Sequence, residues 1–166
     1  RANKGRIAAV RALVGAEAGG HLEDLLAMHA PAKGPDRGLA WHLGLGCLRW
    51  RGALDHALQP LLRQPVHKLD PGVRAALWLG LFEIHHSRTP TRAAVDQAVE
   101  VTKAIGLKRA SGLVNAVLRR ASKTELSTDP RVLLPPWLYD RWNQYSDWLD
   151  RIREPARISI CGTPPN

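Results

Sequence analysis

Basic side chains gather between residues 101 and 125 of the chain. Six lysines and arginines stand there against one glutamate, so this segment carries five of the nine net positive charges. Cations grouped in this way can neutralise the phosphates of a nucleic acid. The competing interpretation is a solvated basic face without a ligand. The six basic residues are Lys103, Lys108, Arg109, Arg119, Arg120 and Lys123.

A helix over residues 108–121 would place most of these cations on one side. Because an α-helix advances by about 100° per residue, the apolar residues of this segment share the opposite side, which is predicted to face the core. The basic side also offers a glycine gap and one amide. The amide of Asn115 either contacts RNA or caps or bridges neighbouring helices. One line of this side contains Lys108, Gly112, Asn115 and Arg119, with Arg109 and Arg120 beside it.

A second basic group surrounds an aromatic residue. Arg49 and Arg51 flank Trp50, and guanidinium groups beside an aromatic ring can pair with phosphate or stack on an unpaired base. Trp50 also continues an apolar stripe of its predicted helix, which favours packing in the core with the two arginines merely beside it. Because of their charge, Arg49 and Arg51 are nevertheless kept as the second candidate pair for binding RNA.

Residues that could hold a metal or catalyse a reaction form no recognisable motif. His85 and His86 are adjacent and lie about 100° apart on a helix, so they cannot chelate as an i, i+4 pair would. Cys47 and Cys161 have no CxxC spacing, and Gly44-Leu45-Gly46 does not continue into GxGxxG. No P-loop, GxSxG or HExxH occurs. The sequence therefore predicts no metal site, no cofactor in this chain and no enzymatic activity of the chain by itself.

Length and composition limit the class of protein. With 166 residues, 45% of them hydrophobic and 23% charged, the chain matches one compact globular domain with at most an appendage. The longest apolar run, Ala75 to Phe82, is far shorter than the roughly 20 residues of a membrane span. Two cysteines are too few for a disulfide scaffold, which favours a reducing, cytoplasmic setting. The net charge of +9 is consistent with a polyanionic partner.

Helical spacing of apolar residues recurs along the chain and predicts an all-α bundle of about six or seven helices. We expect Asp36 to cap one helix, and a separate helix to span residues 51–62 and end near Pro60. Asp70 followed by Pro71 is the clearest start signal, and the helix after it is apolar on nearly all sides, which predicts a central position. Other boundary signals are Gly19, Gly20, Thr89-Pro90 and Gly106.

Beyond residue 121 the composition changes. Residues 122–136 are polar and rich in proline, which is typical of a linker. Residues 136–153 again show helical spacing and predict a helical connector, and residues 157–161 alternate like a strand. The aromatic side of the connector contains Trp137, Trp142, Tyr145 and Trp148.

An ordered series of motifs carries a resemblance to a known family. The series resembles the amino-terminal NusB-like domain of bacterial 16S ribosomal RNA 5-methylcytosine methyltransferases, and the likeness covers roughly residues 7–153. The motifs are Asp36-Arg37-Gly38-Leu39, Gly46-Cys47-Leu48-Arg49-Trp50 with Leu54-Asp55, Leu79-Gly80-Leu81-Phe82, Arg88-Thr89-Pro90 leading to Ala93-Ala94-Val95, Gly112 to Arg120, and Pro136-Trp137-Leu138.

This resemblance implies an all-helical RNA-binding domain that precedes an S-adenosylmethionine-dependent methyltransferase domain and positions 16S ribosomal RNA. It divides the chain into a NusB-like helical domain at residues 1–125 and, at residues 126–166, a connector with the start of a missing methyltransferase domain. Its Val-Asn-Ala-Val-Leu-Arg-Arg signature maps onto Val114 to Arg120. The family's catalytic cysteines belong to the downstream domain, and neither Cys47 nor Cys161 matches them, so no catalytic residue carries over. S-adenosylmethionine is expected only in that missing domain, which would also be a partner of this chain.

Two other functions fit the same sequence. One is a NusB-type transcription antitermination factor, against which the Pro-Trp-Leu connector and the strand-like tail argue. The other is a module without RNA that docks its own catalytic domain or forms a dimer, for which the connector tryptophans are suited.

Overall fold

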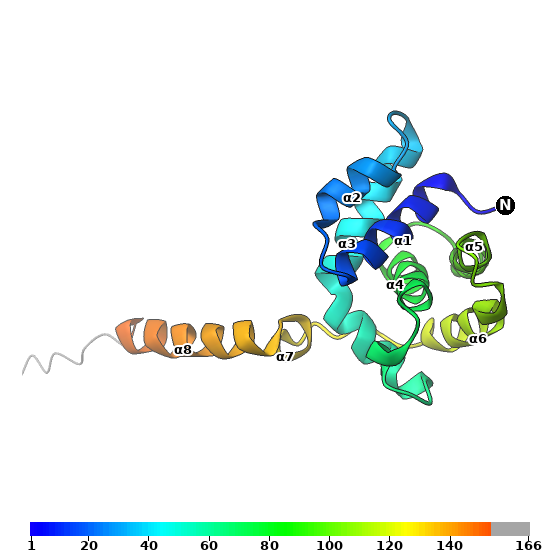
Figure 1. Cartoon of the computed structure of the whole chain (residues 1–166). Helices are drawn as coiled ribbons and strands as arrows, with labels where there is room; N and C mark the ends of the chain where they lie inside the picture. Colours follow the sequence, from blue (N-terminus) through cyan, green and yellow to red (C-terminus); the bar gives the residue numbers. More distant parts are fainter. Residues whose placement is uncertain (154–166) are drawn as a thin grey trace, which may run out of the picture. The chain divides into compact units, whose positions relative to one another are not determined.

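The computed structural model describes the backbone of residues 1–153 and the side chains of residues 1–144, so the strand predicted at residues 157–161 lies outside the described residues. All the regular secondary structure in the described part of the chain is helical, without a strand, which confirms the predicted all-α class (Figure 1). The helices are α1 (Lys4–Glu17), α2 (Leu22–His29), α3 (Pro35–Leu58), α4 (Pro71–His86), α5 (Thr91–Ala104), α6 (Ser111–Ala121), α7 (Pro130–Leu133) and α8 (Pro136–Arg153), with short 3-10 helices at Gln59–Leu61, Val66–Lys68 and Lys108–Ala110.

Helix α4 forms the centre of the bundle, as its apolar sequence predicts. Every residue from Ala75 to Glu83 is buried, and α4 packs against α1, α3, α5 and α6, which surround it in Figure 1. Phe82 and Trp78 are among these buried residues. Because α4 touches most of the other helices, it fixes the positions of the surfaces that α3, α5 and α6 present to solvent.

The predicted helix boundaries around α4 and α5 are confirmed. The Asp70 carboxylate accepts hydrogen bonds from the backbone N–H groups of Gly72 (2.8 Å) and Val73 (3.4 Å), so it caps α4 and leaves Pro71 in the first turn. Gly106 follows α5 with a φ of 92°, a conformation that favours glycine and ends the helix.

Helix α3 differs from the sequence prediction in two ways. It continues without interruption to Leu58, so the separate helix predicted at residues 51–62 is wrong. Its last turns bury apolar residues just as the earlier turns do, and Pro60 is accommodated in the 3-10 turn that follows. Asp36 does not cap the helix, because the residue before Pro35 is Gly34, with a φ of 92°. The Asp36 carboxylate accepts a hydrogen bond from the Asn3 side chain instead (2.7 Å).

Two arginines inside the bundle bind carboxylates from distant parts of the sequence. Arg6 of α1 donates two hydrogen bonds to the fully buried Glu83 of α4, at 2.9 and 2.6 Å. Arg74 of α4 reaches Asp55 of α3 and also donates to Glu17 of α1 at 2.7 Å. These ion pairs tie the three helices α1, α3 and α4 to one another.

Part of the predicted linker at residues 122–136 belongs to the bundle. It contains the short helix α7, which packs against α3. Gly52 of α3 lies so close to the carbonyl oxygen of Val132 that a Cβ atom at this position would collide with it. Contacts within the first compact unit therefore extend from Arg1 to Leu133; a functional division after residue 125 stays a prediction.

The second compact unit begins at Leu134 and contains α8, which confirms the predicted helix at residues 136–153. Trp137 and Trp142 are 65% and 59% exposed. The side chains of Tyr145 and Trp148, which the sequence places on the same aromatic side, lie outside the described residues.

Candidate nucleic-acid interface

The basic segment after α5 forms two elements instead of one helix. Lys108 and Arg109 lie in a 3-10 turn, and α6 begins at Ser111, so the predicted helix start at Lys108 is wrong. The cause is local, because the Ser111 hydroxyl donates to the Lys108 carbonyl (2.7 Å) and the Ala110 N–H bonds back to Leu107 (2.9 Å). The opposite side of α6 is buried, as predicted, through Val114, Val117, Leu118 and Ala121.

The cations of this segment differ in whether an acid already pairs with them. Lys103 of α5 binds Glu100 at 2.7 Å, one turn earlier on the same helix. The other four candidates, Lys108, Arg109, Arg119 and Arg120, are exposed, and no acidic group among the described residues lies within ion-pair distance of them. They form two pairs: Lys108 and Arg109 precede α6 and border a hollow with Asp70 and Val73 of α4, whereas Arg119 and Arg120 lie in the last turn of α6. Unpaired cations such as these can bind an anionic ligand.

Asn115 holds one of these cations in place. Its amide oxygen accepts a hydrogen bond from Nε of Arg119 at 3.1 Å, across one turn of α6. The Asn115 side chain is half-buried, and no hydrogen bond from it to another helix occurs within residues 1–144. Arg119 therefore keeps its terminal nitrogens available for a ligand, while its Nε is fixed to α6.

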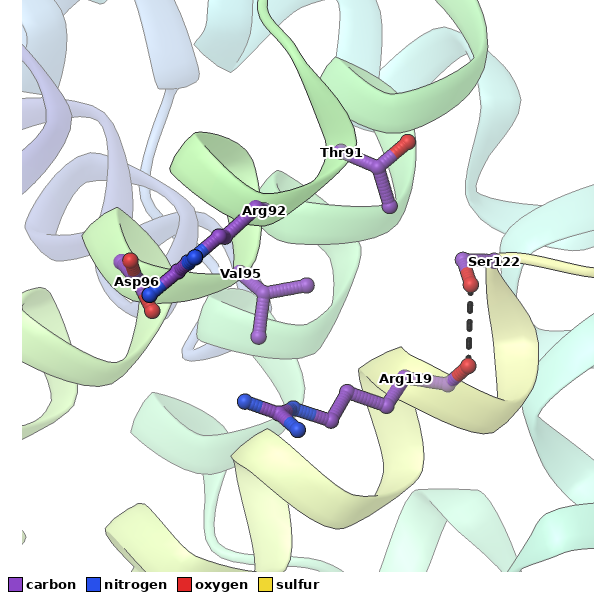
Figure 2. A pocket seen from close by; sticks show the side chains of 6 residues that line it. All are labelled: Thr91, Arg92, Val95, Asp96, Arg119 and Ser122. Carbon is purple, nitrogen blue, oxygen red and sulfur yellow. Dashed lines mark hydrogen bonds between the residues drawn. The ribbon is translucent and has the colours of Figure 1, made fainter.

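Arg119 points into an open hollow of about 580 Å³ between α5 and α6 (Figure 2). The lining combines two guanidinium groups, Arg92 and Arg119, with the hydroxyl-bearing residues Thr91 and Ser122 and one carboxylate, Asp96. Thr91 and Arg92 belong to the first turn of α5, where free N–H groups and the helix dipole also favour an anion. We call these residues the α5–α6 hollow.

The second candidate pair lies on α3. Arg49 and Arg51 are exposed and have no ion-pair partner among the residues that the structure describes. Trp50 between them is half-buried, packs against the core and stacks on His86 of α4 with 4.4 Å between ring centroids. The structure thus places the two arginines outside the core and Trp50 at its edge.

The comparison with protein families identifies the fold. The profile of the NusB family matches residues 3–123, which covers the bundle through α6. The chain belongs to the NusB family.

Individual relatives of this NusB-family chain are methyltransferases by name. It is 38% identical over 168 aligned residues to ribosomal RNA small subunit methyltransferase B of Thermus thermophilus, an alignment that covers 96% of this chain and 41% of that protein. It is 36% identical over 111 residues to the protein of the same name from Pseudomonas putida (62% of this chain, 26% of that one). For the probable ribosomal RNA small subunit methyltransferase B of Bacillus subtilis, the identity is 34% over 133 residues (76% and 29%). The chain spans less than half the length of these relatives.

The sequence reasoning missed part of this NusB-family surface. Thr91, Arg92 and Ser122 line the α5–α6 hollow, but charge counting over residues 101–125 could not include Arg92, which stands on the preceding helix. The signal that could have found it is Thr89-Pro90, which marks a helix start with an arginine in its first turn. Only the fold brings that turn to the carboxyl-terminal end of α6.

Burial shifts the pKa of three titratable side chains in the NusB domain, Cys47, His85 and His86. Among the described residues no group of three or more histidine, cysteine or acidic side chains could hold a metal ion. Burial lowers the pKa of both His85 and His86 below the usual value, with the Ala121 carbonyl and Glu125 acting in the opposite direction on His85. Burial raises the pKa of the Cys47 thiol, so its thiolate is not accessible near neutral pH.

No helix within the described part of the chain combines the length and the apolar character that crossing a membrane requires.

Proposed function

We propose that this chain is the RNA-binding amino-terminal domain of an S-adenosylmethionine-dependent 16S ribosomal RNA cytosine-5-methyltransferase and positions the RNA for a catalytic domain outside this sequence. The observation that carries the proposal is the extent of the match to the Thermus thermophilus methyltransferase, which takes in 96% of this chain. That alignment continues past residue 123, where the NusB family match ends. An antitermination factor would share the bundle but would not need the connector.

The geometry of the basic surface supports the RNA-binding part of the proposal. Lys108, Arg109, Arg119 and Arg120 are exposed and carry charges that no described acid neutralises. Contacts of this kind with phosphates release counterions and fix the position of the RNA backbone without reading its sequence. The domain therefore supplies affinity and orientation, and the choice of the modified base falls to the catalytic domain.

S-adenosylmethionine does not fit this chain. A site of the dinucleotide-binding type needs a strand, a glycine-rich turn and a helix, whereas Gly44 and Gly46 lie within α3, where Gly44 approaches Leu26 and Gly46 approaches the ring of Phe82. We therefore assign the cofactor and the methyl transfer to the missing domain, and none of the residues described here takes part in that chemistry. We propose that the whole protein is located in the cytoplasm.

The test is binding of a 16S ribosomal RNA fragment over a salt series, measured by filter binding. We expect the logarithm of the affinity to fall linearly with the logarithm of salt concentration, with a slope of about −0.7 for each phosphate contacted on a single strand. Binding that does not depend on salt, or no binding at low salt, would remove the RNA-binding function.

A docking function is the second candidate, and the exposure of Trp137 and Trp142 favours it. If a catalytic domain covers these rings in the whole protein, acrylamide should quench tryptophan fluorescence more strongly in this chain than in the full-length protein. Equal quenching in the two proteins would count against docking through α8.

A further inference from the structure

A second hollow lies on the face formed by α3 and α4, and the RNA-binding proposal does not use it. Its lining is largely aromatic, and it contains one cation and no carboxylate. We call it the aromatic hollow. Its residues are Trp41, His42, Leu45, Gly46, Arg49, Trp50 and Phe82.

The shape of the aromatic hollow follows from the spacing of residues on α3. His42, Leu45 and Arg49 recur at intervals of three and four residues and so share one side of the helix. Between them Gly46 leaves a gap, and the ring of Phe82 from α4 fills the space where a Cβ atom would stand. The hollow therefore has an apolar floor, with Phe82 below it and polar or basic groups at its rim.

Rings of several residues meet at this floor. His42 lies 5.6 Å from Phe82 between ring centroids, and Phe82 lies 5.2 Å from His86. His86 also stacks on Trp50 at 4.4 Å. His42 and His86 are exposed, so part of this aromatic group faces solvent in the described structure. Exposed aromatic faces of this kind are the surfaces on which unpaired nucleobases stack.

The polar groups around the floor suit a nucleotide better than an apolar peptide. Arg49 is exposed at the rim and unpaired with any described acid, and the guanidinium of Arg37 lies 5.8 Å from the Trp41 ring centroid. A nucleotide offers a base that can stack on the rings and a phosphate whose negative charge Arg49 can bind.

Two adjacent histidines at the carboxyl-terminal end of α4 contact neighbours of the two hollows. His86 contacts Trp50 and Phe82, which line the aromatic hollow. Its neighbour His85 faces Ala121, the residue before Ser122 of the α5–α6 hollow, and α4 packs against α6 in this region.

We infer that the aromatic hollow binds an unpaired nucleobase of an RNA strand whose phosphates the α5–α6 hollow neutralises. Stacking on the α3–α4 rings supplies the affinity for the base, and Arg49 binds the adjoining phosphate. This inference rests on the proposed RNA-binding function and names the part of the RNA that each hollow takes: phosphate at Arg92 and Arg119, and base at Trp50 and His42.

Two ligands of equal charge test the inference. One is a short oligouridine, and the other is a ribose-phosphate oligomer of the same length without bases. The unmodified chain should bind oligouridine more tightly, by roughly 5- to 150-fold for one stacked base. Trp50→Leu and His42→Ala should each reduce this preference by at least half, without changing the affinity for the base-free oligomer or its salt slope.

Two control variants separate stacking from charge and from fold. Arg119→Gln should weaken binding of both oligomers by the same factor, and Trp142→Leu, which removes an exposed ring on α8, should leave the preference for bases unchanged. His42→Ala covers the case in which Trp50→Leu unfolds the chain, because His42 is exposed, and circular dichroism melts identify that case.

The outcomes distinguish the inference from the function on which it rests. Salt-dependent binding of both oligomers with equal affinity would keep the RNA-binding function and overturn the base site, leaving an apolar protein segment as the occupant. If Trp50→Leu and His42→Ala weaken the binding of both oligomers by the same factor, the base site is also overturned. Failure to bind either oligomer or the 16S ribosomal RNA fragment at low salt would instead remove the function itself.

Discussion

Two groups of arginines in this bundle have opposite surroundings. Arg6 and Arg74 lie between helices. Arg6 binds the carboxylate of Glu83, 77 residues away in the sequence, and Arg74 binds that of Asp55, 19 residues away. Arg119 and Arg120 stand on the surface of α6, where no described acid pairs with them. The position of distant acids thus decides whether an arginine is paired inside the bundle or stays unpaired at its surface, where we propose that it binds RNA.

The largest effect should come from breaking an internal pair. Glu83→Gln leaves the guanidinium of Arg6, which is only 13% exposed, without its charge partner. We expect the free energy of unfolding to fall by about 3 to 5 kcal/mol, as when one member of a buried ion pair is removed. Urea denaturation measures this loss, and the RNA salt slope of the folded fraction should not change.

The matched control is the double replacement Arg6→Leu with Glu83→Leu, which removes both charges. It should recover most of the lost stability, because no unpaired charge remains buried. If Glu83→Gln lowers the free energy of unfolding by less than about 1 kcal/mol, the pair with Glu83 does not give Arg6 a stabilising role different from that of a surface arginine.

Reversing a surface charge should give the opposite pattern. Arg119→Glu should weaken RNA binding about tenfold and reduce the salt slope by roughly one contact, with a change in stability within about 0.5 kcal/mol. Filter binding and thermal melts measure the two quantities. Lys103→Gln is the control, since Lys103 is already paired with Glu100 and should contribute less to the slope. If Arg119→Glu and Arg120→Glu both bind RNA with unchanged affinity, phosphate binding would be assigned to Arg49 and Arg51 instead.

A smaller effect is expected from Asn115→Ala. The variant loses the hydrogen bond that orients Arg119, and an i, i+4 pair of this kind is worth up to about 0.5 kcal/mol. RNA affinity should fall about twofold, with no change in the salt slope. A loss of stability of about 1 to 3 kcal/mol would indicate a bridge between helices. A loss of discrimination among RNA sequences would show that the amide reads a base.

The smallest effect concerns the histidine pair at the carboxyl-terminal end of α4. Burial lowers the folded-state pKa of His85 and His86, so between that value and the ordinary value of about 6.5 the unfolded chain binds more protons. Stability should therefore decline slightly as pH falls from 7 toward 5. Thermal melts of His85→Gln should show a shallower decline, and an unchanged slope would assign the acid sensitivity to other groups.

The fold followed from sequence wherever the signal was local. Asp70 before Pro71 and Gly106 after an amphipathic stretch marked real helix ends, because caps and positive φ angles depend on neighbouring residues alone. The prediction that Asp36 caps a helix was wrong, because its carboxylate binds Asn3, which lies 33 residues earlier in the sequence. The break predicted at residue 51 failed because the apolar spacing of α3 continues to Leu58.

The candidate surface was predictable only in part. The charge surplus near α6 lies within one segment of the sequence, so charge counting alone could select its cations as candidates. Arg92 and Ser122 come together with Arg119 through the packing of α5 against α6, and the aromatic hollow needs Phe82 of α4 beneath Gly46 of α3. These neighbours are set by tertiary contacts, which helix periodicity does not encode.

The close approach of Gly52 to the Val132 carbonyl affects how a following domain would be tethered. If the polypeptide left the bundle at Ala121, every residue from Ser122 onward would add to the length of a flexible tether. Because α7 is attached to α3, the tether starts at Leu133 instead, and a shorter tether raises the effective concentration of whatever it carries. A side chain at position 52 would force α7 to shift away from α3. If the proposed catalytic domain follows this chain, this glycine would therefore limit the distance over which that domain moves relative to the bundle.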